Sequence, residues 1–155
     1  MRFAAISDTH DRLSAVRELV ETLRRERLDF VVHAGDIISP FTLKEFSTLN
    51  IPFYIAFGNN DGERKILTEI AGQMNWRIGD IVEFPGGVVY HGTDTEVLKV
   101  LRKTGEMVVV GHTHEAGIER DGRSVVLNPG EVCGYLTGKR TFAIIEDGEI
   151  SIVEF

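Results

Sequence analysis

Four of the five histidines in this 155-residue chain lie in the loops that follow short apolar runs. The clearest case is VVVGHTHEAG at residues 108–117, where one threonine separates two histidines. Other apolar runs are followed by aspartate, asparagine or a further histidine. These candidate ligands are Asp8, His10, Asp36, Asn59, His91, His112 and His114. Carboxylate, imidazole and amide groups without a thiolate suit Mn²⁺, Fe or Zn²⁺ better than a structural zinc knot.

The number of candidates favours two metal ions over one. A single tetrahedral ion needs fewer ligands, whereas two ions that share a ligand would use the whole set. A carboxylate is the natural shared ligand, because its charge offsets the repulsion between cations about 4 Å apart. Plainer interpretations remain: a structural site for one ion, loop histidines that face water, or turn formation by an asparagine after a glycine, as at Asn59.

The segments that would position these residues alternate between strand and helix. Apolar runs that end in polar or glycine-containing loops predict buried strands at 2–7, 30–33, 53–57, 88–90 and 107–110. Apolar residues three or four apart predict helices at 13–28, 41–49, 63–71 and 95–101. Because strand and helix alternate early, we expect parallel βαβ units. Such units bring the carboxyl ends of the strands to one edge, where open α/β sheets bind ligands.

The last third of the chain has a different pattern. Residues 117–127 and 141–155 are strand-like stretches that each turn at an Asp-Gly pair, which is typical of β-hairpins. We therefore expect a layered α/β protein with parallel pairing early and antiparallel pairing late. No repeat, low-complexity tract or linker interrupts the sequence, so a single domain over 1–155 is expected.

Composition narrows the class of protein. The formal net charge of -7 argues against a broad cationic surface for extended nucleic acid. The single cysteine, Cys133, fits a reducing interior. The first ten residues lack the apolar core of a signal peptide, and no run approaches the about 20 apolar residues that span a bilayer. We expect a cytoplasmic protein with no membrane partner.

Five motifs that contain the candidate ligands occur in one order along the whole chain. They are Asp8-Thr9-His10, Gly35-Asp36, Gly58-Asn59-Asn60-Asp61, His91-Gly92 and Gly111-His112-Thr113-His114. In this order the chain resembles the calcineurin-like metallophosphoesterases, specifically the small YfcE-type phosphodiesterases of bacteria and archaea. The later Asn128-Pro129-Gly130 is similar to the NPG turn of that group.

The resemblance implies a four-layer αββα sandwich of mixed sheets with a dinuclear metal site. One ion would be held by Asp8, His10, Asp36 and His114. The other would be held by Asp36, Asn59, His91 and His112, so that Asp36 bridges the two. The ions would be divalent, Mn²⁺ first, with Ni²⁺, Fe or Zn²⁺ as alternatives. A hydroxide activated between them would attack the phosphorus of a phosphate ester.

Asn60 departs from the family pattern, in which many members read Gly-Asn-His-Asp. An asparagine can donate a hydrogen bond to phosphate but cannot act as a general acid. We therefore expect substrates with good leaving groups. Following the resembled subgroup, we expect diesters rather than monoesters.

Other polar residues have a structural and a functional interpretation. His33 either orients a metal ligand or is a satisfied buried histidine, and the second is simpler. Asp61 either caps the next helix or accepts a hydrogen bond from a ligating histidine. Asp11 is expected to cap a helix and Arg12 to face solvent. Gly111 would permit a sharp exit from its strand through backbone angles that other residues avoid.

The leading hypothesis is a metal-dependent phosphodiesterase that acts on a small phosphate ester. The alternative is a non-catalytic scaffold with the same fold, such as the endosomal retromer subunit, whose ligand set is degraded. A nuclease is less consistent with the sequence, because larger relatives that cut DNA carry additional domains and this chain is acidic. The late hairpins or the 76–90 segment could support a homo-oligomer.

Overall fold

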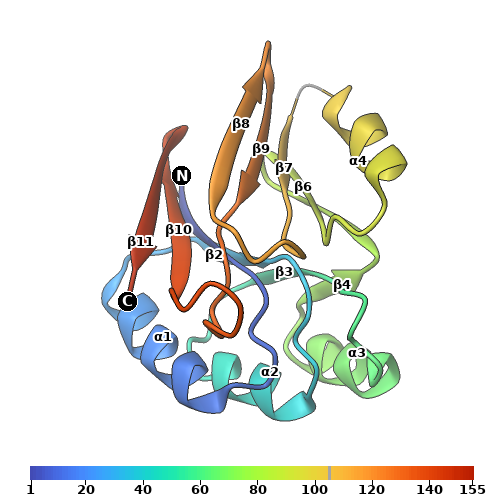
Figure 1. Cartoon of the computed structure of the whole chain (residues 1–155). Helices are drawn as coiled ribbons and strands as arrows, with labels where there is room; N and C mark the ends of the chain where they lie inside the picture. Colours follow the sequence, from blue (N-terminus) through green and yellow to red (C-terminus); the bar gives the residue numbers. More distant parts are fainter. Residues whose placement is uncertain (105) are drawn as a thin grey trace.

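The computed structural model describes residues 1–104 and 106–155, which form two mixed β-sheets and their covering helices (Figure 1). The strands of the first sheet are β1 (Arg2–Ile6), β2 (Phe30–His33), β3 (Phe53–Ala56), β4 (Arg77–Gly79), β10 (Thr141–Glu146) and β11 (Glu149–Glu154). Their order across the sheet is β11-β10-β1-β2-β3-β4. Because β1 and β2 lie inside this sheet and are covered on both faces, their sequences are continuous apolar runs.

The second sheet is built from the middle of the chain. Its strands are β5 (Ile81–Phe84), β6 (Gly87–Tyr90), β7 (Met107–Val109), β8 (Gly117–Asp121) and β9 (Ser124–Asn128). Their order is β5-β6-β7-β9-β8. The edge strand β8 is exposed along its length and carries charged residues, which discourages pairing with another chain.

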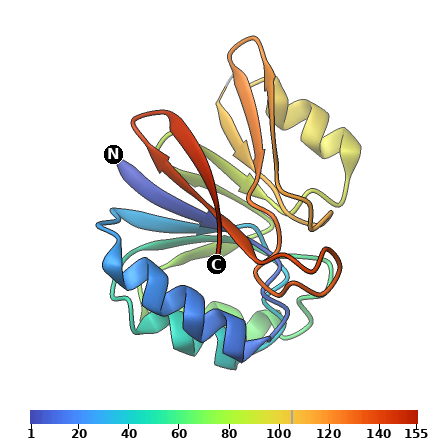
Figure 2. The same ribbon diagram turned by 60° about the vertical axis from the view of Figure 1, so that its left-hand side comes forward.

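Helices cover the outer face of each sheet and give the expected four-layer αββα arrangement (Figure 2). The helices α1 (Leu13–Arg25), α2 (Pro40–Ser47) and α3 (Arg64–Gln73) pack on the first sheet. The helix α4 (Thr95–Arg102) lies on the second sheet against β7 and β9. Among the described residues, no helix is long and apolar enough to cross a membrane.

Three apolar clusters separate the layers. The largest fills the space between the first sheet and its three helices and includes Leu19, Phe46 and Phe53. A second cluster lies between the sheets and includes Phe3 and Val109. A small third cluster of valines on β6, β7 and β9, with Val110, lies under α4. Successive residues of a strand point to opposite faces, so one strand such as β1 contributes to both the first and the second cluster.

Parallel pairing occurs in both sheets and positions the candidate site. In the first sheet β1, β2 and β3 are parallel neighbours. In the second sheet β6, β7 and β9 are also parallel neighbours. The antiparallel pairing expected late in the chain is therefore only part of the pattern, because β9 pairs antiparallel with β8 and also parallel with β7. Each set of three brings the carboxyl ends of its strands to one edge.

Most other elements agree with the sequence-based expectations. The β8–β9 and β10–β11 hairpins are both antiparallel, as predicted. The helix predicted over 13–28 ends at Arg25, because Glu26 already has an extended backbone. The strands β4 and β5 were not predicted, since they are short, contain the charged residues Arg77 and Glu83, and are separated by Asp80.

Candidate metal centre

The seven candidate ligands converge from both sheets. The loops after β1, β2 and β3 supply four of them, and the loops after β6 and β7 supply the other three. None lies on a helix. The adjacent carboxyl edges of the two sheets therefore bring together residues separated by more than 100 positions in sequence.

The first cluster consists of Asp8, His10, Asp36 and His114, each with a ligand atom within 4.8 Å of the others. The Nε2 atom of His10 lies 3.3 Å from Oδ2 of Asp36 and 3.8 Å from Oδ1 of Asp8. The Nε2 atom of His114 lies 3.4 Å from the same Oδ1 atom of Asp8. Two of these buried atoms, Oδ1 of Asp8 and Nε2 of His10, have no hydrogen-bond partner. Buried polar atoms are rarely left unpaired, so their convergence fits a cation.

The second cluster adjoins the first through Asp36. The side-chain oxygen Oδ1 of Asn59 lies 3.0 Å from Nε2 of His91 and 3.0 Å from Nδ1 of His112. The Nε2 atom of His91 is also 3.5 Å from Oδ2 of Asp36. Because that same Asp36 oxygen contacts His10, it lies between the two clusters and could be shared by two ions.

Hydrogen bonds fix the orientation of two of these imidazoles. The Nδ1 atom of His91 donates to the carbonyl oxygen of Ala34 at 2.6 Å. The Nδ1 atom of His114 donates to Oε2 of Glu131 at 2.6 Å. When Nδ1 carries the proton, the lone pair of Nε2 points toward the clusters, as metal binding requires.

Glu131 is a functional candidate that the sequence reasoning missed. Its fully buried carboxylate accepts hydrogen bonds from the backbone N–H groups of Tyr135, Leu136 and Thr137, at 3.0, 3.0 and 2.6 Å. Although burial alone would raise the pKa of Glu131, hydrogen bonds from His114, Thr137 and Cys133 lower that pKa to about 2. The carboxylate therefore stays ionised. Its position directly after the Asn-Pro-Gly turn, at the end of β9, was the available signal.

Cys133 is buried beside Glu131 and donates from Sγ to Oε2 at 3.1 Å. Burial, together with the Glu131 carboxylate, raises the pKa of the Cys133 thiol to about 12. The side chain stays a neutral thiol at neutral pH. It therefore lacks the thiolate that a nucleophile would need, although its Sγ lies within 4.8 Å of ligand atoms of His10 and His114.

Asp61 supports the loop that carries Asp36. Its carboxylate accepts from the backbone N–H groups of Asp36, Ile37 and Ile38 and from that of Gly58, at 2.7 to 3.1 Å. It neither caps α3 nor contacts a candidate histidine through a hydrogen bond, so both interpretations from the sequence are wrong. A single buried carboxylate thus joins the loops after β2 and β3.

His33 is a satisfied buried histidine, as the simpler interpretation held. Its Nδ1 accepts from the backbone N–H of Gly35 at 3.1 Å, and its Nε2 lies 3.2 Å from Oγ1 of Thr9. The Thr9 hydroxyl donates in turn to the carbonyl oxygen of Asp36 at 3.3 Å. Burial lowers the pKa of His33 to about 3, so the ring is neutral.

Asn60 contacts the central carboxylate through two hydrogen bonds. Its backbone N–H donates to Oδ1 of Asp36 at 2.9 Å, and its side-chain Nδ2 donates to Oδ2 at 2.8 Å. Burial alone would raise the pKa of Asp36, yet His10, His91 and Asn60 hold that pKa well below its usual range. Asp36 in turn, with Asp8, raises the pKa of His10 to about 9. The carboxylates thus give this edge a strong affinity for positive charge.

Asp11 and Arg12, which follow the Asp8-Thr9-His10 motif, do not have the capping and solvent-facing positions expected from the sequence. Asp11 makes no side-chain cap to α1, whose N-cap is Arg12. Arg12 is partly buried and donates a short hydrogen bond to the carbonyl oxygen of Cys133. Its guanidinium carbon lies 5.6 Å from the centroid of the Tyr135 ring. The guanidinium group is therefore held against Cys133 and Tyr135 instead of extending freely into solvent.

The backbone is unusual at the candidate ligands. Five of them have left-handed φ angles: Asp8 (52°), His10 (43°), Asp36 (57°), His112 (71°) and His114 (65°). Such angles are uncommon outside glycine and cluster at functional sites. Gly111 is not left-handed, contrary to expectation. It is needed for space, because a Cβ there would lie 1.9 Å from Oγ of Ser7.

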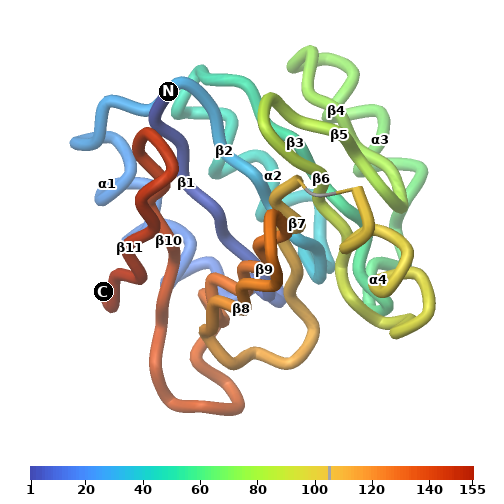
Figure 3. The backbone as a smooth tube through the Cα atoms, turned by 90° about the horizontal axis from the view of Figure 1, so that it is seen from above, coloured from blue at the N-terminus to red at the C-terminus, as the bar shows by residue number. Residues whose placement is uncertain are grey.

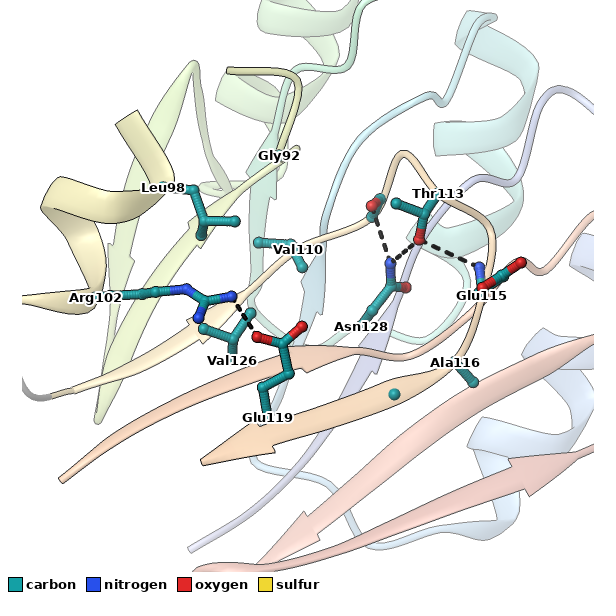
Figure 4. A pocket seen from close by; sticks show the side chains of 12 residues that line it. Gly92, Leu98, Arg102, Val110, Thr113, Glu115, Ala116, Glu119, Val126 and Asn128 are labelled. Atoms are coloured by element: carbon teal, nitrogen blue, oxygen red, sulfur yellow. Dashed lines mark hydrogen bonds and ion pairs between the residues drawn. The ribbon is translucent and has the colours of Figure 1, made fainter. Parts of the chain in front are cut away.

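A separate pocket of about 340 Å³ lies behind the loop that carries His112 and His114 (Figure 4). Leu98 and Arg102 of α4 border one side of it. At its other end, Nδ2 of Asn128 donates to the carbonyl oxygen of Gly111 and to Oγ1 of Thr113, each at 2.9 Å. The asparagine of the Asn-Pro-Gly turn therefore holds the histidine loop in place.

Comparison with known proteins agrees with the resemblance drawn from the motifs. A profile of the calcineurin-like phosphoesterase superfamily domain matches residues 1–148. A phosphodiesterase of Methanocaldococcus jannaschii is 38% identical over 94% of this chain and 93% of its own length. The solved structure of an archaeal phosphodiesterase, 36% identical, superimposes over the full length of both chains with a TM-score of 0.94. The YfcE phosphoesterase of E. coli, 20% identical over 99% of this chain and 92% of its own, has the same fold with a TM-score of 0.74.

Proposed function

Because the chain belongs to the calcineurin-like phosphoesterase superfamily, we propose that it is a phosphodiesterase that requires two divalent metal ions. The observation that carries this proposal is the pair of buried, unpaired atoms, Oδ1 of Asp8 and Nε2 of His10, in a cluster with Asp36 and His114. A carboxylate and an imidazole that releases its proton when a metal binds are ligands for the same class of cation.

In this proposal the seven candidate residues hold the ions, with Asp36 shared. Divalent ions in such a site lower the pKa of a bound water and neutralise the oxygens of a phosphate group. Glu131 and the Ala34 carbonyl would keep the Nε2 lone pairs of His114 and His91 available to the ions. Asp61 holds the backbone on both sides of Asp36. The nature of the metals is open, with Mn²⁺ first and Ni²⁺, Fe or Zn²⁺ as alternatives.

Asn60 supports a preference for good leaving groups. Its Nδ2 lies 2.8 Å from Oδ2 of Asp36, so a substrate phosphate at the ions would lie within its reach. An amide can donate a hydrogen bond to a phosphate oxygen but cannot protonate a departing alkoxide. Aryl esters, whose leaving groups need no proton, are therefore the expected substrates in an assay.

The test compares metal content and turnover in the same preparations. The protein is treated with chelator and then assayed on bis-p-nitrophenyl phosphate and on the monoester, with and without Mn²⁺. We expect turnover only with metal and in favour of the diester, together with two bound ions by elemental analysis. Asp36→Asn should lose both ions and activity. A metal-free protein as active as the loaded one would refute the proposal.

The alternative, a non-catalytic scaffold, gives a different result in the same experiment. A scaffold would bind metal, or none, without turnover of either ester at any metal concentration. The complete set of seven candidate ligands argues against it. Residues such as His112 and Asn59, which make few contacts apart from those within the centre, would not be needed for a structural role.

A further inference from the structure

The loop between β9 and β10, residues 129–140, extends beyond the ends of these two strands (Figure 3). It lies next to the candidate centre, because its residues Glu131 and Tyr135 contact or border His114 and His10. It presents two large apolar side chains, Tyr135 and Leu136, which are 57% and 73% exposed. The centroid of the Tyr135 ring lies 6.3 Å from that of the His10 ring. Two apolar side chains are thus held in solvent at the border of a site that is otherwise polar.

The loop is held in this shape by its own buried carboxylate. Glu131 accepts from the N–H groups of Tyr135 and Leu136 themselves, and from both the N–H and the hydroxyl of Thr137. The same carboxylate orients His114. The positions of the two apolar side chains are therefore fixed relative to the proposed metal ligands.

Arg12 adds positive charge to this surface. Its guanidinium lies against the Tyr135 ring and donates to the Cys133 carbonyl, which also fixes its position. In a chain with a net charge of -7, a cation beside the Tyr135 ring, which itself lies near His10, complements the negative charge of a phosphate ester. An aromatic face, an aliphatic side chain and a cation are together suited to a planar aromatic group attached to a phosphate.

We propose that Tyr135, Leu136 and Arg12 form a subsite that binds an aromatic ester group of the substrate, such as an aryl or nucleoside group. The proposal rests on the function proposed above, because the phosphate of the same substrate would lie at the metal centre. The ring of Tyr135 provides the stacking surface, Leu136 covers the edge of the bound group, and Arg12 contacts a phosphate oxygen.

The test is the affinity of two slowly hydrolysed diesters, diphenyl phosphate and dimethyl phosphate, for the Mn²⁺-loaded protein by calorimetry. We expect the wild type to bind the diphenyl ester at least tenfold more tightly. Tyr135→Ala should remove most of this preference, whereas Tyr135→Phe, which keeps the ring, should retain it. Val100→Ala, which shortens a 62% exposed side chain on α4, is the matched control and should change nothing.

Equal affinities in the wild type, absent binding of both esters, or an unchanged preference in Tyr135→Ala would each overturn the subsite. If Tyr135→Ala instead alters the sedimentation coefficient with the preference unchanged, the surface is a contact between copies of the chain and the subsite is also overturned. Turnover of bis-p-nitrophenyl phosphate, measured in parallel, tests the proposed function separately. A protein without turnover but with the expected preference would retain the subsite and lose the enzymatic function.

Discussion

Replacing the buried carboxylate of Glu131 should weaken both the fold and the metal centre. Each oxygen of Glu131 accepts from several donors: Oε2 from His114, Tyr135 and Cys133, and Oε1 from Leu136 and Thr137. In Glu131→Gln an NH₂ group replaces one oxygen and faces the donors on that side. With about two donors left unsatisfied at about 1–3 kcal/mol each, we expect a loss of about 3 kcal/mol in the free energy of unfolding.

The same substitution should also affect His114. The glutamine presents to Nδ1 of His114 either its NH₂ group or a neutral amide oxygen, which accepts more weakly than a carboxylate. The ring can then carry its proton on Nε2 more readily, so that the lone pair no longer points toward Asp8. A carboxylate that accepts a hydrogen bond from the other ring nitrogen of a ligating histidine typically contributes 10- to 100-fold to metal affinity. We expect Glu131→Gln to lose affinity for Mn²⁺ in that range. The hydrogen bonds that Glu131 accepts from Cys133 and from residues 135–137 of the loop would affect the free energy of unfolding and not the affinity for metal.

Urea unfolding of the metal-free protein and calorimetric titration with Mn²⁺ measure the two effects separately. Glu96→Gln is the matched control, because Glu96 forms an exposed ion pair with Lys99 on α4. Removing such a pair changes stability by less than about 0.5 kcal/mol. A loss below about 1 kcal/mol in Glu131→Gln, with unchanged affinity for Mn²⁺, would show that this carboxylate organises neither the loop nor His114.

Three further predictions concern the residues around the centre. Because burial lowers the pKa of His33 to about 3, only the unfolded chain protonates this residue between pH 6.5 and 3, which takes about 2 kcal/mol from the free energy of unfolding between pH 7 and 5. His10, whose pKa is raised to about 9, contributes in the opposite direction over the same range. In urea unfolding, His33→Gln should therefore gain stability at pH 5 relative to pH 7 by about that amount compared with the wild type, and equal pH slopes would contradict the argument. Asp61→Asn leaves about two backbone N–H groups near Asp36 unpaired and should lower the free energy of unfolding by about 3 kcal/mol. An unchanged urea midpoint would contradict the role of Asp61 in joining the loops after β2 and β3. Gly111→Ala should lower the free energy of unfolding by more than about 1 kcal/mol, because the new methyl group meets Oγ of Ser7. Adding Ser7→Ala to the same chain should restore part of the lost stability. A double variant as unstable as Gly111→Ala would rule out the contact with Ser7 as the cause.

The candidate ligands could be found in the sequence because their side-chain chemistry differs from that of ordinary loops. A histidine after a run of valines, as at His112, is informative by its type and its position at a strand end. The supporting groups are different. Glu131 and Asp61 are common carboxylates whose roles depend on the direction of backbone N–H groups in three dimensions. Neighbouring residues do not specify that direction, so local sequence patterns could point to the positions of these two carboxylates but not to their roles.

The fold shows the same division between local and distant determinants. Helices such as α1 follow from apolar spacing within one segment, and the two late hairpins follow from their Asp-Gly turns. The parallel pairing of β7 with β9 depends on which strands meet in the second sheet, and no local pattern encodes it. The left-handed φ angles at Asp8 and His114 were also not predictable, because residue type there is set by side-chain chemistry rather than by backbone preference.

The pairing of β1 with β10 has a consequence for synthesis of the chain. The two strands join Arg2 to Glu146, so β1 can pair on only one of its edges until almost the whole chain has left the ribosome. At about 10 residues per second, its second edge would remain open for more than about 10 s. An unpaired, apolar strand edge is prone to association with other chains. Nascent copies of this protein should therefore depend on chaperones more than the size of the finished molecule indicates.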